Sequence, residues 1–391
     1  MLAELDDKTF LRHTNNANNE IYILNSKNAP NVLREIGRLR EVTFRDAGGG
    51  TGKEIDFDEF DSGENAFMQM IVWDPLEKEI VGGYRYVLCK DLSIDENNNV
   101  ASPTASLFRY NNNFIDQYFQ YTIELGRSFV QPLYQPTFNL RRGIYALDNL
   151  WGGLGAPTIE YPDIKYLFGK VTMYIEFDKL ARDIILFFFD KYFPDKENLI
   201  SPLKPLSRTT SDKVLNNIFT GCNYEEDYKI MVQKVRKLGE NVPPLFNAYM
   251  NLSSTMKTFG TALNDHFGGV EETGILVTVD DIYDVKKERH LTSYQKKPFQ
   301  LHPSSEDEQQ SLPDSSPPSP ENATVRLPSF TVPCAVIETL VPPLASSTFC
   351  VHGKLGFVIV LSPSLVLYER EFITPSPVLL AVKVIVISSG S

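Results

Sequence analysis

Basic residues are in the minority in this sequence. The chain of 391 residues carries 38 lysines and arginines against 50 aspartates and glutamates, so its formal net charge is −12. Proteins that bind nucleic acids usually have a basic surplus or a basic stripe, and electrostatic adhesion to anionic lipid needs one as well. The charge balance therefore argues against both functions.

Cysteine is scarce, and the cysteines stand far apart. A disulfide framework or a zinc site is built from closely spaced cysteines. The acidic run DFDEFD (56–61) lacks the spacing of a calcium-binding loop and has no histidine beside it. We expect a protein of a reducing compartment without a metal site. The four cysteines, none in a CxxC pair, are Cys89, Cys222, Cys334 and Cys350.

Long apolar runs are absent too. No segment approaches the ~18 apolar residues that span a bilayer. The N-terminal stretch MLAELDDKTF contains no basic region followed by an apolar one, so no signal peptide is visible. We therefore predict a cytoplasmic protein.

The composition changes near residue 297. Thirteen of the 25 prolines but only one of the 18 tyrosines lie in 298–391. This segment opens with HPSSEDEQQSLPDSSPPSPEN, which is typical of a disordered linker, and continues with short apolar runs broken by prolines. We predict one domain over 1–297. Our hypothesis for 298–391 is a tail outside the functional fold, an aberrant extension being one explanation.

The first 297 residues alternate between the periodicities of strands and helices. Such an order indicates an α/β domain with a mixed sheet and helices on both faces. The predicted strands are 20–25, 66–74, 79–89, 121–130, 165–174 and 274–282, and the predicted helices are 28–44 (capped by Asn28 or Asn31), 114–119, 141–155 (ending at its glycines), 177–193, 211–219, 225–238 and 244–258.

The sequence matches neither of two well-known functional motifs, the phosphate-binding loop and the nucleophilic triad. AGGGTGKE (47–54) has Ala47 and Glu54 where a phosphate-binding loop requires glycine and serine or threonine, and it follows a helix, so we interpret it as a flexible glycine loop. None of the five histidines lies in a G-x-S-x-G or Cys/His context, which excludes a recognisable nucleophilic triad. Cys89 ends a strand and is interpreted as a buried structural thiol.

Charged residues occur in the middle of a predicted central strand. Glu124 and Arg127 lie in YTIELGRSFV (121–130). Alternation puts Glu124 and Gly126 on one face and Arg127 on the other, unless a bulge intervenes. Burying charges in such a strand costs free energy unless they form ion pairs or act in binding or catalysis. For Glu124 and Arg127, a buried ion pair and a functional role are about equally good interpretations.

Several segments together resemble a known family. REIGRLREVTFR (34–45), DFDEFD (56–61), GGYRY (82–86) and ELGRSFV (124–130) occur in the order found in the GNAT-like N-acyltransferases that make amino-acid lipids. These are the ornithine-lipid and glycine-lipid enzymes, also labelled hemolysins. The resemblance covers about residues 10–295 and is strongest to the Bacteroides-type branch, which acylates glycine; ornithine is the other acceptor it allows.

A more distant resemblance is to acyl-homoserine-lactone synthases. Both families imply the GNAT fold, a mixed sheet splayed to admit a pantetheine arm. The positions that match their Arg-x-x-x-Phe helix, Asp-x-x-Asp run, hairpin arginine and Glu-x-x-Arg strand are Arg40 and Phe44, Asp58 and Asp61, Arg85, and Glu124 and Arg127.

The reaction that the resemblance implies moves a (3-hydroxy)fatty acyl group from a thioester to an α-amino group. The amine must lose a proton and the oxyanion must be stabilised, for which Glu124 is the candidate base and backbone N–H groups after Arg127, near Ser128, the candidate oxyanion donors. A carboxylate of the acceptor suits a bidentate arginine. The candidates are Arg40, Arg85 and Arg127, with Asp58 and Asp61 holding the ammonium or fixing the arginines and Phe44 completing the substrate site.

The donor implied is the acyl-phosphopantetheine of acyl carrier protein, with no permanently bound cofactor. QPTFNLRRGIYAL (135–147) lacks the glycine spacing of ordinary acetyl-CoA enzymes, but a helix that begins near Arg141, Arg142 and Gly143 can still bind a phosphate. An acidic carrier protein needs a basic docking patch. Candidates for it are Arg34, Arg38, Arg141, Arg142, Lys165 and Lys170.

Two other functions compete with this one. A homoserine-lactone-type synthase would need S-adenosylmethionine, for which no dedicated motif is visible. A membrane-active hemolysin would need exposed apolar or amphipathic segments, and only the tail offers apolar runs. In the leading interpretation any membrane contact is peripheral and arises from the lipid product.

Charge reversal tests the docking role. Changing Arg141 and Arg142 together to glutamate should raise the KM for an acyl-carrier-protein substrate and leave the KM for the amino acid unchanged, because only the carrier contacts that surface. Steady-state kinetics with each substrate varied in turn measures this. Equal effects on both KM values would contradict a docking role.

Overall fold

The computed structural model describes residues 1–63, 66–138, 143, 145–291, 351–352 and 356–357. The chain divides into two units, Met1–His302 and Pro303–Ser391. In the second unit β11 (Val351–His352) pairs with β12 (Gly356–Phe357) in antiparallel fashion. The predicted domain boundary at residue 297 and almost all of the predicted tail lie outside the described residues, so that division stays a prediction.

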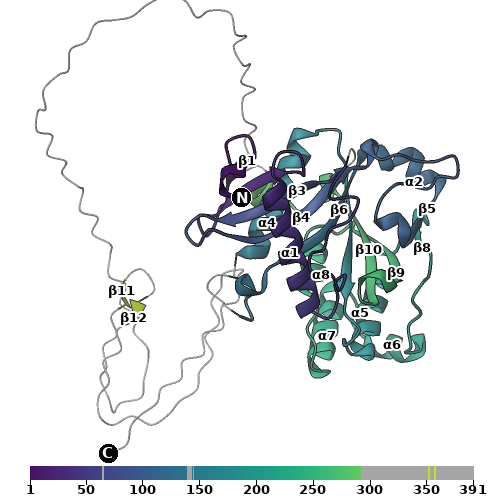
Figure 1. Ribbon diagram of the computed structural model, residues 1–391. Coiled ribbons are helices and arrows are strands. Elements are labelled where there is room, and N and C mark those ends of the chain that lie inside the picture. Colours follow the sequence, from purple (N-terminus) through teal and green to yellow (C-terminus); the bar gives the residue numbers. More distant parts are fainter. Residues whose placement is uncertain (64–65, 139–142, 144, 292–350, 353–355, 358–391) are drawn as a thin grey trace, which may run out of the picture. The chain divides into compact units, whose positions relative to one another are not determined.

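Within the described residues of the first unit, eight strands form one mixed sheet in the order β1-β2-β3-β4-β6-β7-β10-β9 (Figure 1). These strands are β1 (Phe10–His13), β2 (Glu20–Leu24), β3 (Met68–Asp74), β4 (Glu79–Leu88), β6 (Thr122–Val130), β7 (Tyr166–Met173), β9 (Lys257–Asn264) and β10 (Val270–Thr278). A separate antiparallel pair joins β5 (Phe108–Tyr110) to β8 (Ile200–Pro202).

Helices cover both faces of the sheet, as predicted. The α-helices are α1 (Pro30–Asp46), α2 (Asn112–Gln117), α4 (Ala146–Glu160), α5 (Lys179–Tyr192), α6 (Asp212–Ile218), α7 (Tyr224–Lys237), α8 (Pro244–Met250) and α9 (Asp284–His290). The 3-10 turns are η1 (Leu2–Glu4), η2 (Cys89–Asp91), η3 (Thr104–Ser106), η4 (Phe119–Tyr121), η5 (Pro132–Tyr134), η6 (Asp265–Phe267) and η7 (Val279–Asp281). No helix in the described part of the chain is long and apolar enough to cross a membrane.

The strands β6 and β7 separate about a third of the way along their length. Their parallel pairing covers only residues 122–124 of β6 and 166–168 of β7. Beyond that point β6 stays paired with β4 as far as Val130, and β7 stays paired with β10 as far as Met173. The sheet is therefore continuous at one end and open between its two central strands at the other.

A bulge interrupts β6 where the strands separate. Gly83 pairs with Phe129 and Arg85 with Gly126, so β6 contains one residue more than β4 in this interval. Arg127 has a positive φ of 53°, in the left-handed region that non-glycine residues rarely adopt. An extra residue shifts the alternation of side chains. The sequence predicted opposite faces for Glu124 and Arg127 unless a bulge intervenes. The bulge is present, so Arg127 lies on the same face of the sheet as Glu124.

Helix α1 covers that face. Its apolar residues recur at helical spacing, and they pack against Ile71, Trp73 and Phe129 of the sheet. The predicted asparagine cap is wrong: the N-cap is Ala29, and the Glu4 carboxylate instead accepts hydrogen bonds from the backbone N–H groups of Asn31 and Val32. A carboxylate from a neighbouring segment satisfies these N–H groups as well as a local side chain does.

An aromatic cluster extends the same face beyond α1. It joins Phe108, Tyr110, Phe114 and Phe119, from the segment between β4 and β6, to Phe168 of β7. This cluster fixes η3 against the sheet next to the point of separation. Cys89 is buried within it, as predicted for a structural thiol.

The opposite face carries the largest apolar core. Leu125, Val171 and Ile275 of the central strands pack there against α4, α5, α7 and α8. Around this core several predicted boundaries are wrong. The predicted helix 244–258 ends at Met250 and gives way to β9, and the last strand begins at Val270, four residues before its predicted start. The elements β1, β5, β8, β9 and α9 were not predicted.

The predicted end of the helix 141–155 is also wrong. Helix α4 runs through its glycines and through Pro157 to Glu160. Close packing explains the glycines, because a Cβ on Gly153 would meet the Met70 side chain, and one on Gly155 would collide with the His290 carbonyl oxygen. These glycines therefore permit helix contacts, and they do not end the helix.

Two glycines of α4, one closely packed and one not, allow a test of the packing explanation. Gly155→Ala should lower the free energy of unfolding by about 1–3 kcal/mol, because the backbone at His290 must move. Gly152→Ala is the matched control: no atom lies within 4 Å of its added Cβ, so better helix propensity should stabilise it by about 0.5–1 kcal/mol. Denaturant titration of both variants measures this, and equal effects would refute the packing explanation.

Candidate active site

A cavity of about 660 Å³ occupies the opening between β6 and β7. It reaches both faces of the sheet, since its walls include α1 on one side and α4 and the start of α8 on the other. Its lining consists of Thr43, Phe44 and Ala47; residues 125–130; residues 135–137, Gly143, Ala146 and Leu147; residues 170–172 and Tyr174; residues 243–245; and Phe267 and Glu272.

The two halves of the cavity differ in chemistry. On the α4 side the walls are mainly apolar, with Leu125, Val171, Leu147 and Leu245. On the α1 side the lining includes the charged side chains Arg127, Lys170 and Glu272, with the rings of Phe44, Tyr174 and Phe267 around them. The cavity can thus hold a molecule with an apolar chain at one end and charged groups at the other.

Arg127 is held in place from two sides. Its Nε lies 2.7 Å from Asp56 Oδ2, and its Nη2 lies 3.7 Å from Asp58 Oδ2. Its guanidinium carbon is 4.3 Å from the centre of the Phe267 ring, a cation–π contact. The side chain keeps 19% of its surface exposed and lines the cavity. Arg127 therefore combines fixed geometry with access to a ligand.

Arg40 and Arg85 are buried behind Arg127. Arg40 donates to both carboxylate oxygens of Asp61, at 3.1 and 2.8 Å, and also to the Asp56 carbonyl oxygen. Arg85 donates to both oxygens of Asp58, at 2.6 and 2.8 Å, and lies 3.0 Å from Asp61 Oδ2. Each arginine side chain is only 1% exposed. Their hydrogen bonds are directed at aspartates, and neither side chain lines the cavity.

The loop 56–61 supplies all three aspartates of this cluster. It is anchored to α1 by the hydrogen bond from the Asp56 N–H to the Gly37 carbonyl, where a side chain would crowd the Asp56 carbonyl. Burial opposes ionisation of Asp61, but the adjacent Arg40 and Arg85 guanidiniums outweigh it and lower the pKa of Asp61 to about 2. Gln69 adds a further hydrogen bond to Asp61 at 3.0 Å. The cluster thus contains three aspartates facing three arginines.

Glu124 lies at the last paired position before β6 and β7 separate. It is 2% exposed and does not line the cavity. Its Oε1 accepts a 2.6 Å hydrogen bond from the Thr104 hydroxyl, and its buried Oε2 accepts none from the residues that the structure describes. Thr104 in turn accepts a 2.8 Å hydrogen bond from Lys170, which does line the cavity. Glu124 is therefore connected to the cavity through two side chains.

Lys170 and Glu272 meet on the cavity wall. They come from the adjacent strands β7 and β10, and Lys170 Nζ lies 3.7 Å from Glu272 Oε2. Tyr174 is close by: its burial, with the charge of Glu272 adding to the effect, raises the pKa of Tyr174 to about 12. The inclusion of Lys170 among surface docking residues is corrected by this position, since its side chain is 14% exposed.

The residues singled out from the sequence fall into three groups. Phe44, Arg127, Ser128 and Gly143 line the cavity; a Cβ on Gly143 would lie 2.5 Å from the Pro136 nitrogen, so only glycine fits there. A second group, set behind the wall, comprises Arg40, Asp58, Asp61, Arg85 and Glu124. Arg141 and Arg142 lie outside the described residues. Glu124 and Arg127 do not form the buried ion pair considered for them, since each has other partners.

Sequence reasoning did not place five of the lining residues in the cavity. Glu272 precedes the predicted start of its strand, so its face could not be assigned. Lys170 alternates correctly within a predicted strand and could have been placed on the Glu124 face, as could Thr172. Tyr174 ends the same predicted strand and alternates with Lys170 and Thr172, whereas Phe267 lies in the turn η6, where no pattern indicates an interior position.

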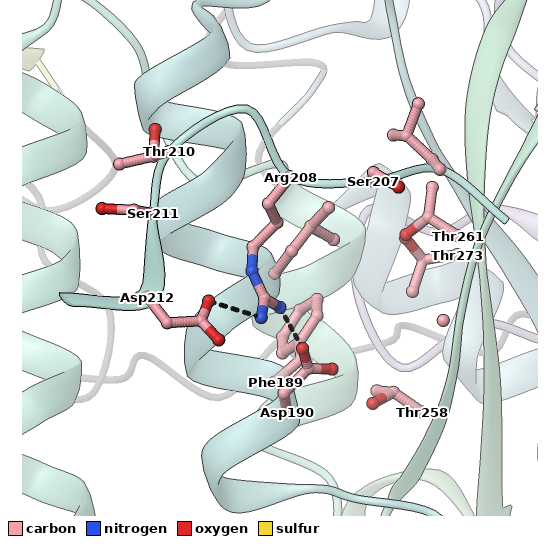
Figure 2. A pocket seen from close by; sticks show the side chains of 13 residues that line it. Phe189, Asp190, Ser207, Arg208, Thr210, Ser211, Asp212, Thr258, Thr261 and Thr273 are labelled. Carbon is pink, nitrogen blue, oxygen red and sulfur yellow. Dashed lines mark hydrogen bonds and ion pairs between the residues drawn. The ribbon is translucent and has the colours of Figure 1, made fainter. Parts of the chain in front are cut away.

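A second cavity, of about 460 Å³, lies between α5, β9 and the loop before α6 (Figure 2). Its lining includes Ser207, Thr258 and Thr261, and it contains none of the residues predicted from the sequence. Arg208 points between Asp190 and Asp212 and forms ion pairs with both carboxylates. Its one arginine is thus paired with acidic residues of the same lining, and the cavity lies on the opposite face of β10 from Glu272.

Two curated relatives match most of the chain. The glycine N(alpha)-acyltransferase of Phocaeicola vulgatus is 51% identical over 294 residues, which is 75% of this chain and 90% of the relative. The glycine N(alpha)-acyltransferase of Bacteroides thetaiotaomicron is 52% identical over 292 residues, 75% of this chain and 87% of the relative. Both confirm the predicted resemblance and its closest branch.

The acetyltransferase (GNAT) domain matches residues 39–142, which contain the C-terminal half of α1, the aspartate loop and β6. Among solved structures, a CoA-dependent acyl-homoserine lactone synthase with SAM and isopentyl-CoA is 11% identical and covers 72% of this chain and 95% of its own, with a TM-score of 0.33, too low to bear on function. The identities to the two curated relatives decide the matter. The chain belongs to the family of these glycine N(alpha)-acyltransferases and is an N-acyltransferase with a GNAT domain.

Proposed function

We propose that this enzyme transfers a (3-hydroxy)fatty acyl group from the thioester of acyl carrier protein to the amino group of glycine. The observation that carries the proposal is the cavity through the sheet, apolar at one end and charged at the other. The names of the two relatives support glycine as the acceptor. The product would be an N-acyl amino acid, a precursor or component of an amino-acid lipid, made in the cytoplasm.

The apolar half suits the donor. A fatty chain can lie against Leu125, Val171 and Leu147, where burial is favourable by about 25 cal/mol per Å² of apolar surface. Because pairing between β6 and β7 stops at Glu124, the β7-facing edge of residues 125–128 is free to accept the amide groups of a phosphopantetheine arm. The exposed Arg34 and Lys165 lie on the surface that a carrier protein could contact.

The charged half suits a small zwitterion. Arg127 can bind the carboxylate of glycine, because its guanidinium is fixed by Asp56 and by Phe267 and still reaches the cavity. In this proposal Arg40, Arg85, Asp58 and Asp61 are positioning residues, since they hold the aspartate loop that holds Arg127. The rings of Tyr174 and Phe267 border this half of the cavity.

The chemistry needs no covalent enzyme intermediate, because a thioester is already activated. The glycine nitrogen attacks the thioester carbonyl, the C–N bond forms, the C–S bond breaks, and the thiolate leaves with a proton. Backbone N–H groups at the bulge beside Ser128 are the proposed oxyanion donors. We propose that Glu124, predicted as the base, is instead a positioning residue: it holds Thr104, which holds Lys170 at the cavity, and it does not touch the amine itself.

Product analysis tests the proposed reaction. The full chain, incubated with 3-hydroxyacyl carrier protein and an equimolar mixture of amino acids, should yield N-acylglycine as the main product by mass spectrometry. The matching acyl-CoA should be the poorer donor, because a carrier protein adds docking contacts. N-acylornithine as the main product would contradict the acceptor, and equal rates from both donors would contradict the carrier protein.

Substitution of Arg127 tests the carboxylate subsite. Arg127→Gln should raise the KM for glycine about 10–100-fold, because a charge-assisted hydrogen bond contributes about 1.5–3 kcal/mol. It should also abolish the preference for glycine over glycinamide, which lacks the carboxylate. The control is Arg38→Gln, an exposed α1 arginine paired with Glu35, which should change neither. Retained preference in the Arg127 variant would refute the assignment.

A further inference from the structure

We infer that Glu272 is the residue that receives the amino group of the acceptor, a role that neither the sequence nor the relatives assign to it. This inference deepens the proposed function and rests on it. It concerns the one carboxylate that lines the described cavity.

Glu272 is buried yet incompletely bonded. The residue is 4% exposed, lines the cavity, and has a buried Oε2 that accepts no hydrogen bond from the described residues. Its ion pair with Lys170 is long, at 3.7 Å. A buried carboxylate oxygen without a hydrogen bond is costly, so a donor that enters the cavity would relieve that cost.

The formal charges favour a cationic donor. Around Arg127 three arginines face three aspartates, so that cluster is balanced. On the other side of the charged half, Lys170 faces two carboxylates, Glu272 directly and Glu124 through Thr104. One negative charge is left without a partner among these groups. A primary ammonium supplies the missing charge and three N–H donors.

The Arg127 and Glu272 subsites together can bind a zwitterion. Arg127 and Glu272 line the same charged half, and Phe267 and Tyr174 lie beside them. An α-amino acid would point its carboxylate at Arg127 and its ammonium at Glu272. The ammonium first gives one proton to the Glu272 carboxylate, which releases it to solvent, and the neutral amine then attacks the thioester carbonyl. As the C–N bond forms and the C–S bond breaks, the second proton passes through Glu272 to the departing thiolate. Glu272 is thus a catalytic residue as well as a binding one.

The neighbouring residue provides a matched control. Glu271 is also 4% exposed, but it faces the other side of β10, where its Oε1 lies 2.9 Å from Arg182 and 3.2 Å from Lys179. The two glutamates share their chemistry, burial and strand. They differ in their surroundings: Glu271 is bound by two cations away from the cavity, whereas Glu272 lines the cavity and has one distant cation.

Paired glutamine substitutions test the inference. Glu272→Gln should raise the KM for glycine and for glycinamide by the same factor, about tenfold or more, and leave the KM for the acyl donor unchanged. Glu271→Gln should lower the melting temperature and change neither KM. Glu272→Asp, which keeps the charge, should recover part of the affinity for glycine. An unchanged KM for glycine in Glu272→Gln, or equal changes in both glutamine variants, would overturn the inference.

A binding measurement separates this inference from the proposed function. Isothermal titration of the full chain with glycinamide should give heat with the wild type and none with Glu272→Gln. If that holds while glycine is not acylated, the amine site stands and the proposed acceptor fails. If glycine is acylated but both proteins bind glycinamide equally, the function stands and the Glu272 assignment fails.

Discussion

Three aspartates from one short loop bind three arginines from three different elements, and the site depends on this buried cluster. Arg40 comes from α1, Arg85 from β4 and Arg127 from β6, so the loop 56–61 joins the covering helix to two central strands. Buried ion pairs contribute little net stability, but removal of one partner leaves an uncompensated charge and costs about 3–5 kcal/mol. The cluster therefore acts mainly to fix geometry, and its outermost member, Arg127, is the one that reaches the cavity.

The left-handed residue in β6 is part of the same arrangement. Without the extra residue at the bulge, alternation would turn Arg127 toward the α4 side, among the apolar walls. With it, Arg127 and the Glu124–Thr104–Lys170 chain share one face, and the apolar half of the cavity stays free of charge. A single inserted residue thus separates the two chemical halves of the site.

The sequence was informative where the chemistry is local and poor where it depends on packing. The order of the motifs from Arg34 to Val130 indicated the fold, the family and most of the charged cluster. The strand alternation around Glu124 was right as well, but the burial of Glu124 depends on Thr104, from a loop with no periodic pattern. Glu272 was missed because the start of β10 was placed four residues late. Gly155 was wrongly taken to end its helix, because the group that requires a glycine there, the His290 carbonyl of α9, is distant in the chain.

The opening between β6 and β7 passes through the sheet, and this has a consequence for how the product leaves. An N-acylated amino acid would straddle the sheet, its hydrocarbon on the α4 side and its head group on the α1 side. Since the strands are paired at Glu124 and Phe168, such a molecule either moves sideways toward the unpaired end or has its hydrocarbon drawn through the sheet. A longer hydrocarbon would then slow release of the product more than it slows bond formation, and product release would become the rate-limiting step.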